Sequence, residues 1–331
     1  IADAREALDA LLAELRGHRI RPAFAERIDE LRRRWNGVVD AALAPSGRPL
    51  PGQPEIIGAV HGAAGPRDVV VQAAGSLPGD LHKLWRVRDP LGYHVEYAFS
   101  CMGYEIAGGL GVRRAVLASR NSAVHPGDDD RDVIVMVGDG SYLMLHTELL
   151  TAVAEGLKII VVLIQNHGYA SIGHLSETVG SERFGTRYRY QDARTGDFDG
   201  PGLLPVDLAA NARSYGIDVI EVGPGAEVTT RIADAVRAAR ASERSTLIHV
   251  ESDPTVYGPD GAGWWDVPVA AVSTLPSTEE ALAEYRVQRE RQRPLLGGGP
   301  APDAATAAHT APDAATTATV PLSDDRESTL S

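Results

Sequence analysis

The stretch VMVGDGSYLMLHTELL, residues 135–150, joins an apolar run directly to a helical pattern through Gly138, Asp139 and Gly140. The apolar run predicts a buried strand, and the periodic residues after it predict a helix. An acid between two glycines contributes little to packing at such a junction. A carboxylate at a strand end is suited to bind a metal ion, and glycines let the backbone approach a phosphate. The stretch therefore predicts a site for a metal and a phosphate.

Residues 56–253 repeat this alternation of apolar runs and helical patterns. The apolar runs are residues 68–73, 133–138, 159–166, 217–222 and 246–252, and the helical patterns include residues 103–118, 144–155, 206–215 and 226–241. Continuous apolar strands are typical of parallel sheets that are buried on both faces. We therefore predict an α/β fold with a doubly wound, mostly parallel sheet and helices on both faces. Ligands of such folds bind at the carboxyl ends of the strands.

The segments on either side of this region have different patterns. Apolar residues at helical spacing predict two amphipathic helices within residues 1–43, and residues 44–55 form a Pro/Gly-rich linker. Residues 56–296 would then form the main domain. Residues 297–331 contain an imperfect ten-residue duplication with five acids, one arginine and almost no large apolar residue. Because such a composition cannot offset the entropy of ordering the chain, we predict a disordered tail.

Composition and charge exclude several classes of protein. The formal net charge of −13 argues against a nucleic-acid-binding surface, which needs clustered Lys and Arg. No apolar run approaches the roughly 18 residues needed to cross a membrane, and the amphipathic start of the chain does not resemble a signal peptide. Cys101 is the only cysteine, so no internal disulfide can form. These observations favour a cytoplasmic protein that binds neither nucleic acid nor membranes.

A second polar residue completes the candidate metal site. Asn166 stands at the end of the next apolar run, separated from Gly140 by the 25 residues 141–165. If the two strands are adjacent and parallel, the Asp139 carboxylate and the Asn166 amide oxygen lie close together at one edge of the sheet. Both are hard oxygen ligands that suit Mg²⁺ or Ca²⁺ better than zinc. The alternative is a glycine-rich strand-to-helix turn of any Rossmann-like domain.

This spacing resembles the magnesium-diphosphate motif of thiamine-diphosphate enzymes, in which Gly-Asp-Gly is followed some two dozen residues later by Asn. The resemblance implies that Asp139, Asn166 and the backbone carbonyl of Gly168 bind Mg²⁺. It also implies that the diphosphate lies against Gly138, Gly140 and Ser141.

The same resemblance extends to an upstream segment, residues 76–111. Met102 matches the bulky apolar residue that forces the cofactor into its bent conformation, and the carbonyl of Ser100 matches the acceptor for the cofactor's amino group. Gly79 and His82 lie in the stretch LPGDLHKLW, where His82 resembles a polar contact to the diphosphate. The alternatives are that Met102 fills a gap in the core and that His82 lies on the surface.

Longer matches resemble one branch of this family, the trihydroxycyclohexane-1,2-dione hydrolases of myo-inositol breakdown. They include YHVEYAFSCMGYEIAGGLG (93–111) and NHGYASIGHLSETVGSERFGTRYR (166–189). This resemblance implies a C–C bond hydrolase of a cyclic dione that uses thiamine diphosphate and Mg²⁺. His82, His146 and Gln165 depart from the branch pattern. An acetolactate-synthase-like carboligase or decarboxylase acting on 2-oxo acids, or a cofactor-binding subunit without turnover, stays open.

Thiamine-diphosphate enzymes also use a glutamate on a separate pyrimidine-binding domain to activate the cofactor. This sequence contains no candidate for that glutamate, because Glu96 and Glu105 lie in the wrong segment and are interpreted as structural or surface acids. We therefore assign no catalytic residue. The resemblance implies a partner that supplies the glutamate, either in a longer chain or on another subunit, and an oligomeric assembly. Residues 1–43 would be the closing helices of a middle domain.

A last group of residues follows Asn166 and is predicted to face the substrate. A polyhydroxylated dione would require several hydrogen-bond donors, and this segment offers His167, Tyr169, Ser171, His174 and Arg187. The alternative is that these side chains lie in solvent. The sequence assigns no role to His61, His94, His249 or His309.

Overall fold

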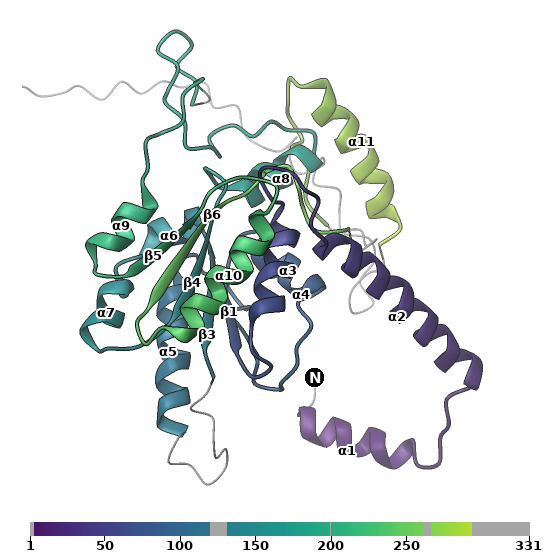
Figure 1. The fold of residues 1–331 in the computed structure, drawn as a ribbon. Coiled ribbons are helices and arrows are strands. Elements are labelled where there is room, and N and C mark those ends of the chain that lie inside the picture. Colours follow the sequence, from purple (N-terminus) through teal and green to yellow (C-terminus); the bar gives the residue numbers. More distant parts are fainter. Residues whose placement is uncertain (1–2, 120–130, 199, 261–265, 293–331) are drawn as a thin grey trace, which may run out of the picture. The chain divides into compact units, whose positions relative to one another are not determined.

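The computed structural model describes residues 3–119, 131–198, 200–260 and 266–292. In this part of the chain a six-stranded sheet has the order β2-β1-β3-β4-β6-β5, and every strand pair is parallel (Figure 1). The strands are β1 (Val69–Gln72), β2 (Tyr93–Val95), β3 (Val133–Gly138), β4 (Ile160–Gln165), β5 (Asp218–Val222) and β6 (Thr246–Glu251). The predicted parallel sheet is confirmed. The predicted tail, residues 297–331, lies outside the described residues.

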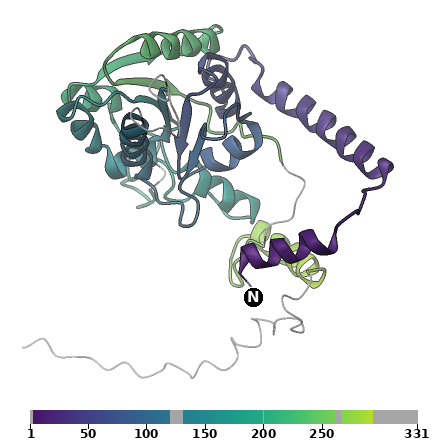
Figure 2. The same ribbon diagram turned by 90° about the horizontal axis from the view of Figure 1, so that it is seen from below.

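Alternating side chains of the strands divide the core into two layers. Ile134, Met136 and Ile160 belong to the layer on one face, and Val133, Val135 and Val161 belong to the layer on the other. The first layer packs against α2 (Pro22–Leu43), α3 (Gln53–Ala63), α4 (Leu77–Leu84) and α10 (Val228–Ala241). The second packs against α5 (Tyr104–Ser119), α6 (Asp139–Leu145), α7 (Glu148–Ala154) and α9 (Leu208–Ser214). The doubly wound arrangement is thus confirmed, and Figure 2 shows helices on both sides of the strands.

The predicted helix at residues 144–155 is wrong in its extent. Helix α6 begins at Asp139, directly after β3, and α7 follows after a short break. At the break, the N–H groups of Leu149 and Leu150 bond to the carbonyls of His146 and Thr147, three residues back. These tighter bonds replace the regular α-helical ladder, so the segment forms two short helices.

The described residues divide into two compact units, one made of those up to 178 and from 182 to 260, and the other made of residues 179–181 and 266–292. The sheet and its covering helices belong to the first unit, which also contains α1 (Ala4–Glu14) and α8 (Ala170–Thr178). In the second unit, α11 (Pro276–Glu290) is tied at its start by the hydroxyl of Thr278, which donates to the carbonyl of Gly180 at 2.8 Å. The predicted domain boundaries stay predictions.

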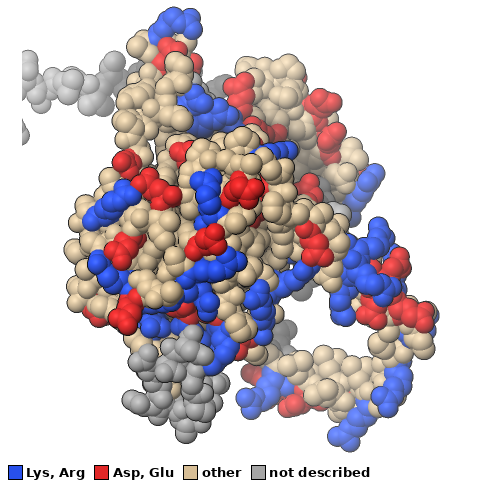
Figure 3. Space-filling view, in the orientation of Figure 1, with Lys and Arg blue, Asp and Glu red and all other residues tan. Residues whose placement is uncertain are grey.

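None of the described helices combines the length and the apolar composition that crossing a membrane requires. On the face seen in Figure 3, acidic and basic side chains are interspersed.

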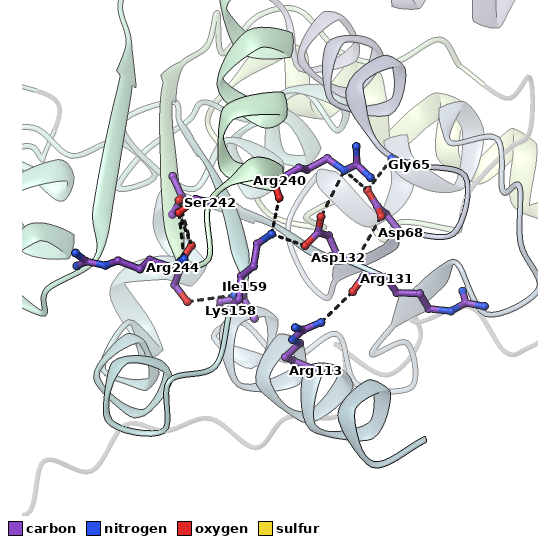
Figure 4. A network of polar contacts seen from close by, with 12 residues as sticks. Gly65, Asp68, Arg113, Arg131, Asp132, Lys158, Ile159, Arg240, Ser242 and Arg244 are labelled. Carbon is purple, nitrogen blue, oxygen red and sulfur yellow. Dashed lines mark hydrogen bonds and ion pairs between the residues drawn. The ribbon is translucent and has the colours of Figure 1, made fainter. Parts of the chain in front are cut away.

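A polar network joins the amino ends of three strands to the end of α10 (Figure 4). Arg240 Nε donates to Asp68 Oδ2 at 2.8 Å and lies 3.5 Å from Asp132 Oδ2. Lys158 Nζ lies 2.8 Å from Asp132 Oδ1 and 2.7 Å from the carbonyl oxygen of Arg240. The Asp68 side chain is only 2% exposed and also accepts the N–H of Gly65. Because Asp68, Asp132 and Lys158 precede β1, β3 and β4, the network fixes where these strands begin.

The substitution Arg240→Met tests this network. It keeps the apolar stem but leaves the buried Asp68 carboxylate without its cation. We expect the free energy of unfolding, measured by urea denaturation, to fall by about 1–3 kcal/mol. The control is Arg237→Met on the same helix, whose ion pair with Asp234 is 58% and 65% exposed. It should cost about 0.5 kcal/mol or less, and equal losses in both variants would contradict the role given to the network.

Candidate cofactor and metal site

The predicted site lies at the carboxyl edge of the sheet, where the winding of the chain reverses. From β1 the chain passes to β2 on one side and then returns to β3 on the other side of β1. The connections that leave β1 and β3 therefore run in opposite directions. In open α/β sheets this switch point is the usual position of a bound ligand.

The carboxylate of Asp139 joins the tips of β3 and β4. Its Oδ2 accepts the N–H of Asn166 at 3.1 Å and the N–H of Gly168 at 3.2 Å, and its Oδ1 accepts the N–H of Gly140 at 2.9 Å. The residue is 1% exposed. Burial raises the pKa of Asp139 to about 6, although these hydrogen bonds act to lower it. The structure thus brings Asp139 and Asn166 together, while their role as metal ligands stays a prediction.

The side-chain oxygen of Asn166 is buried without a hydrogen-bond partner. An unpaired buried acceptor costs about 1–3 kcal/mol, so it calls for an explanation. A divalent cation beside Asp139 would give this oxygen a partner and would offset the buried charge. In the described part of the chain, no cluster of three His, Cys, Asp or Glu residues could hold a metal. A mixed set of carboxylate, amide and carbonyl oxygens is what Mg²⁺ accepts, so the residues fit this ion.

The loop after β4 has an uncommon backbone conformation. His167 has φ 60, in the left-handed region that non-glycine residues rarely adopt. Its carbonyl accepts the N–H of Tyr188 at 2.8 Å, and Gly168 forms an isolated antiparallel bridge with Arg187. A Cβ on Gly168 would lie 2.2 Å from the carbonyl oxygen of Thr186. Only glycine therefore fits at this position.

Two predicted site residues lie against Gly140, Met102 from the cofactor set and Tyr169 from the substrate-facing group. A Cβ there would lie 2.9 Å from Cδ1 of Tyr169 and 3.1 Å from Cε of Met102. Met102 therefore lies beside the start of α6, and its role in bending the cofactor stays a prediction. Ser100 has φ 50, a second left-handed residue, and its Oγ donates to the carbonyl of Ala73 at 3.1 Å, just after β1. Uncommon backbone conformations of this kind concentrate at functional sites.

A second buried carboxylate, that of Glu105, ties this group of loops together. It is 1% exposed and accepts the N–H of Ala74 at 3.1 Å and the N–H of Gly103 at 3.0 Å. Burial raises its pKa, and a hydrogen bond with the Ser141 hydroxyl is among the contacts that act to lower it. Its partners belong to the end of β1, the turn before α5 and the start of α6. Glu105 is thus a structural acid, but a buried one at the centre of the site.

The structure offers no comparable support for three other predicted cofactor contacts, His82, Gly79 and Gly138. His82 stacks on Tyr97, with ring centroids 5.6 Å apart, and also packs near Tyr93. A Cβ on Gly79 or on Gly138 would meet no atom within 4 Å. The structure thus gives no steric reason for glycine at these two positions, and His82 is exposed with two tyrosine rings beside it, as the surface alternative expects.

The residues predicted to face the substrate lie in two places, the loop after β4 and helix α8. Tyr169 and His167 belong to the loop at the site, and Arg187 is exposed next to the Gly168 bridge. Ser171 lies on α8 with His174, which stacks on Tyr257 at 3.8 Å between ring centroids.

The hydroxyl of Tyr188 is a further buried polar atom without a hydrogen-bond partner. Its ring packs at right angles to Tyr169, with centroids 5.5 Å apart. Burial raises the pKa of Tyr188, and the nearby charge of Asp139 raises it further. Tyr188 is not predicted from the sequence, because no motif marks a tyrosine 22 positions after Asn166 as part of the site.

The sequence of this chain matches a protein family and several curated proteins. Residues 73–250, just over half of the chain, match the family model described as "Thiamine pyrophosphate enzyme, C-terminal TPP binding domain". The chain is 35% identical over 294 residues to 3D-(3,5/4)-trihydroxycyclohexane-1,2-dione hydrolase of Geobacillus thermodenitrificans, covering 88% of this chain and 42% of that protein. It is 36% identical over 292 residues to 3D-(3,5/4)-trihydroxycyclohexane-1,2-dione hydrolase 1 of Bacillus cereus, with the same coverage.

The chain therefore spans less than half the length of these curated relatives. Among solved structures, benzoylformate decarboxylase from Polynucleobacter necessarius aligns with a TM-score of 0.48 and 18% identity, over 62% of this chain and 33% of that one. By its match to the family model, the chain belongs to the thiamine pyrophosphate enzymes and carries their C-terminal TPP-binding domain.

Proposed function

We propose that this chain binds thiamine diphosphate through Mg²⁺ and supplies the diphosphate-binding half of an enzyme that hydrolyses a C–C bond of a cyclic dione. Family membership supports the cofactor, and the relatives named as trihydroxycyclohexane-1,2-dione hydrolases support the substrate class. The resemblance to that branch also supports a place in inositol catabolism, and a cytoplasmic location stays a prediction. The observation that carries the metal assignment is the buried, unpartnered oxygen of Asn166 beside the Asp139 carboxylate.

Each residue of the site has a separate task in this proposal. The Asp139 carboxylate, the Asn166 side-chain oxygen and the Gly168 carbonyl hold the ion, while Gly140 and Ser141 border the diphosphate. Met102 and the Ser100 carbonyl shape the organic part of the cofactor. When bound, thiamine diphosphate supplies the electron sink that C–C cleavage needs, and the protein supplies orientation and a dry pocket.

The proposed enzyme needs a further part that carries an activating glutamate. Glu105 is buried and bonded to backbone N–H groups, and Glu96 accepts the N–H groups of Phe99 at 3.2 Å and Cys101 at 2.7 Å. Neither carboxylate is therefore free to activate the cofactor. We propose that the glutamate comes from a pyrimidine-binding domain of a longer chain or of another subunit, within an oligomer.

The substitution Asn166→Ala separates metal binding from folding. It removes an oxygen that has no protein partner but keeps the N–H that bonds to Asp139. We expect an unchanged or slightly higher Tm without ligands, and Mg²⁺-dependent binding of thiamine diphosphate weakened by a factor on the order of 10–100 or more. Calorimetric titration with and without Mg²⁺ measures the binding.

A partnered asparagine provides the matched control. Asn211 Oδ1 accepts the hydroxyl of Tyr142 at 2.7 Å, so Asn211→Ala should lower the Tm and leave the Mg²⁺-dependent binding intact. Normal Mg²⁺-dependent binding by the Asn166→Ala variant would refute its assignment as a ligand.

The substitution Asp139→Ala should affect both properties. It removes the proposed ligand and also three hydrogen bonds to backbone N–H groups, each worth about 1 kcal/mol or more to a charged acceptor. We therefore expect both a lower Tm by calorimetric scanning and loss of Mg²⁺-dependent binding. A variant that binds thiamine diphosphate normally in Mg²⁺ would contradict the site.

Turnover distinguishes the two reactions that share the cofactor residues. In an assembly that includes the pyrimidine-binding part, we expect hydrolysis of the trihydroxycyclohexane dione and little reaction with pyruvate. Product formation from each substrate at equal concentration measures this preference. Preferential use of pyruvate would favour the acetolactate-synthase-like alternative, and cofactor binding without either reaction would favour a subunit without turnover.

A further inference from the structure

A chain of hydrogen bonds crosses the carboxyl ends of β4 and β6, next to the predicted metal site. His249 Nε2 lies 2.6 Å from Gln165 Oε1, and Gln165 Nε2 lies 3.1 Å from His167 Nδ1. His167 Nε2 lies 3.4 Å from Glu251 Oε1. The paired strands set these positions, because Gln165 stands opposite Glu251 and His249 lies two residues before Glu251 on β6. None of the predicted site roles involves His249 or Gln165.

One arrangement of hydrogens makes all three contacts favourable. The amide oxygen of Gln165 only accepts, so His249 carries its hydrogen on Nε2. The amide nitrogen of Gln165 donates, so His167 accepts on Nδ1 and carries its own hydrogen on Nε2, facing the Glu251 carboxylate. Burial lowers the pKa of His249, which favours the neutral ring that this arrangement contains.

The chain of hydrogen bonds ends on a residue with an uncommon conformation. His167 stands between Asn166 and Gly168, two predicted metal-binding residues, and has φ 60. A non-glycine residue in this region costs on the order of 1–3 kcal/mol, and the surrounding structure must hold it there. Here both ring nitrogens of His167 have partners, and its carbonyl accepts the N–H of Tyr188 at 2.8 Å.

Gln165 is well placed to transmit an orientation from β6 to this loop. It is 4% exposed and belongs to β4, so its backbone is fixed in the centre of the sheet. Its side-chain amide has two possible orientations. When His249 carries its hydrogen on Nε2, the amide oxygen faces His249 and the amide nitrogen faces His167. Without His249 this contact no longer favours either orientation, and an amide oxygen facing His167 would leave Nδ1 without a donor as long as the ring carries its hydrogen on Nε2.

We propose that His249 and Gln165 are positioning residues that hold the metal loop, residues 166–168, in its binding conformation by fixing the ring of His167. His249 has no place among the proposed ligands and acts through Gln165. The proposal rests on the proposed function in one respect, that residues 166–168 form the metal site. A purely structural role in sheet packing is the rival explanation, and it predicts no coupling to His167.

Two substitutions at position 249 test the proposal in the full chain. We expect His249→Leu to raise the Mg²⁺ concentration that half-saturates thiamine diphosphate binding by about tenfold. His249→Gln should stay near the unsubstituted value, because its amide nitrogen can donate to Gln165 Oε1. The control is His61→Leu. His61 lies on α3, and its Nε2 lies 2.9 Å from the carbonyl oxygen of Arg86. This substitution should leave the Mg²⁺ requirement unchanged. Equal effects of Leu and Gln at position 249 would overturn the proposal.

A double substitution shows whether the effect passes through His167. Glycine adopts the left-handed conformation without strain and has no ring to orient. In a His167→Gly background we therefore expect His249→Leu to cause no further change in the Mg²⁺ requirement. An equal loss in both backgrounds would show that His249 acts by another route and would overturn the proposal.

A measurement without cofactor separates this proposal from the proposed function. In ¹⁵N NMR spectra of the unsubstituted chain, His167 and His249 should both show the Nε2–H tautomer, and His249→Leu should move the His167 ring signals toward a mixture of tautomers. An Nδ1–H tautomer at either ring, or His167 signals unmoved by His249→Leu, would refute the hydrogen-bond chain. Absence of Mg²⁺-dependent binding in the unsubstituted chain would instead refute the proposed function.

Discussion

The carboxylate of Asp139 accepts three backbone N–H groups across the gap between β3 and β4, and the carboxyl edge of the sheet is organised around it. Strand pairing ends at this edge, so the amides beyond it need other acceptors. A single buried carboxylate provides them, and in doing so it brings the Asn166 side chain to the same place. Burying this charge is unfavourable, as the raised pKa of Asp139 shows. A cation at this point would relieve the cost that the architecture creates.

Buried carboxylates join separate segments of the chain at three places in the fold, by accepting backbone N–H groups from them. Glu105 connects the end of β1 to the turn before α5 and to the start of α6, as Asp139 connects β3 to β4. Asp68, at the amino ends of the strands, accepts backbone N–H groups together with the side chain of Arg240. Asp68 therefore has a cation within the chain, whereas Asp139 and Glu105 are held mainly by backbone and hydroxyl donors. At the amino ends of the strands, the buried charge of Asp68 is therefore balanced within the chain. At the carboxyl ends, the buried carboxylates of Asp139 and Glu105 have no such cation among the hydrogen-bond partners described above, which is where a bound cation would act.

The sequence predicted the central strands well, because their apolar runs are continuous; β3 has the predicted bounds of residues 133–138. It also predicted the meeting of Asp139 and Asn166, since neighbouring parallel strands end at one edge. It missed β2, which is three residues long and half-buried, and the start of α3 at Gln53 inside the predicted linker. There Pro54 fits the first turn, and Glu55 accepts the N–H of Gly52 at 2.8 Å. Glu105 was interpreted only as a structural or surface acid and His249 received no role, because their partners Ala74 and Gln165 lie 31 and 84 positions away and no local pattern indicates them.

The register of β3 on β4, in which Gly138 stands opposite Ile164, limits which sequence changes the site can tolerate during evolution. Exchange of one aliphatic residue for another inside either strand leaves the polar tips where they are. Insertion or deletion of one residue would turn every following side chain to the opposite face and carry the acid away from the amide. We therefore expect related domains to differ in the aliphatic residues of these strands more readily than in the number of residues from Val133 to Asp139.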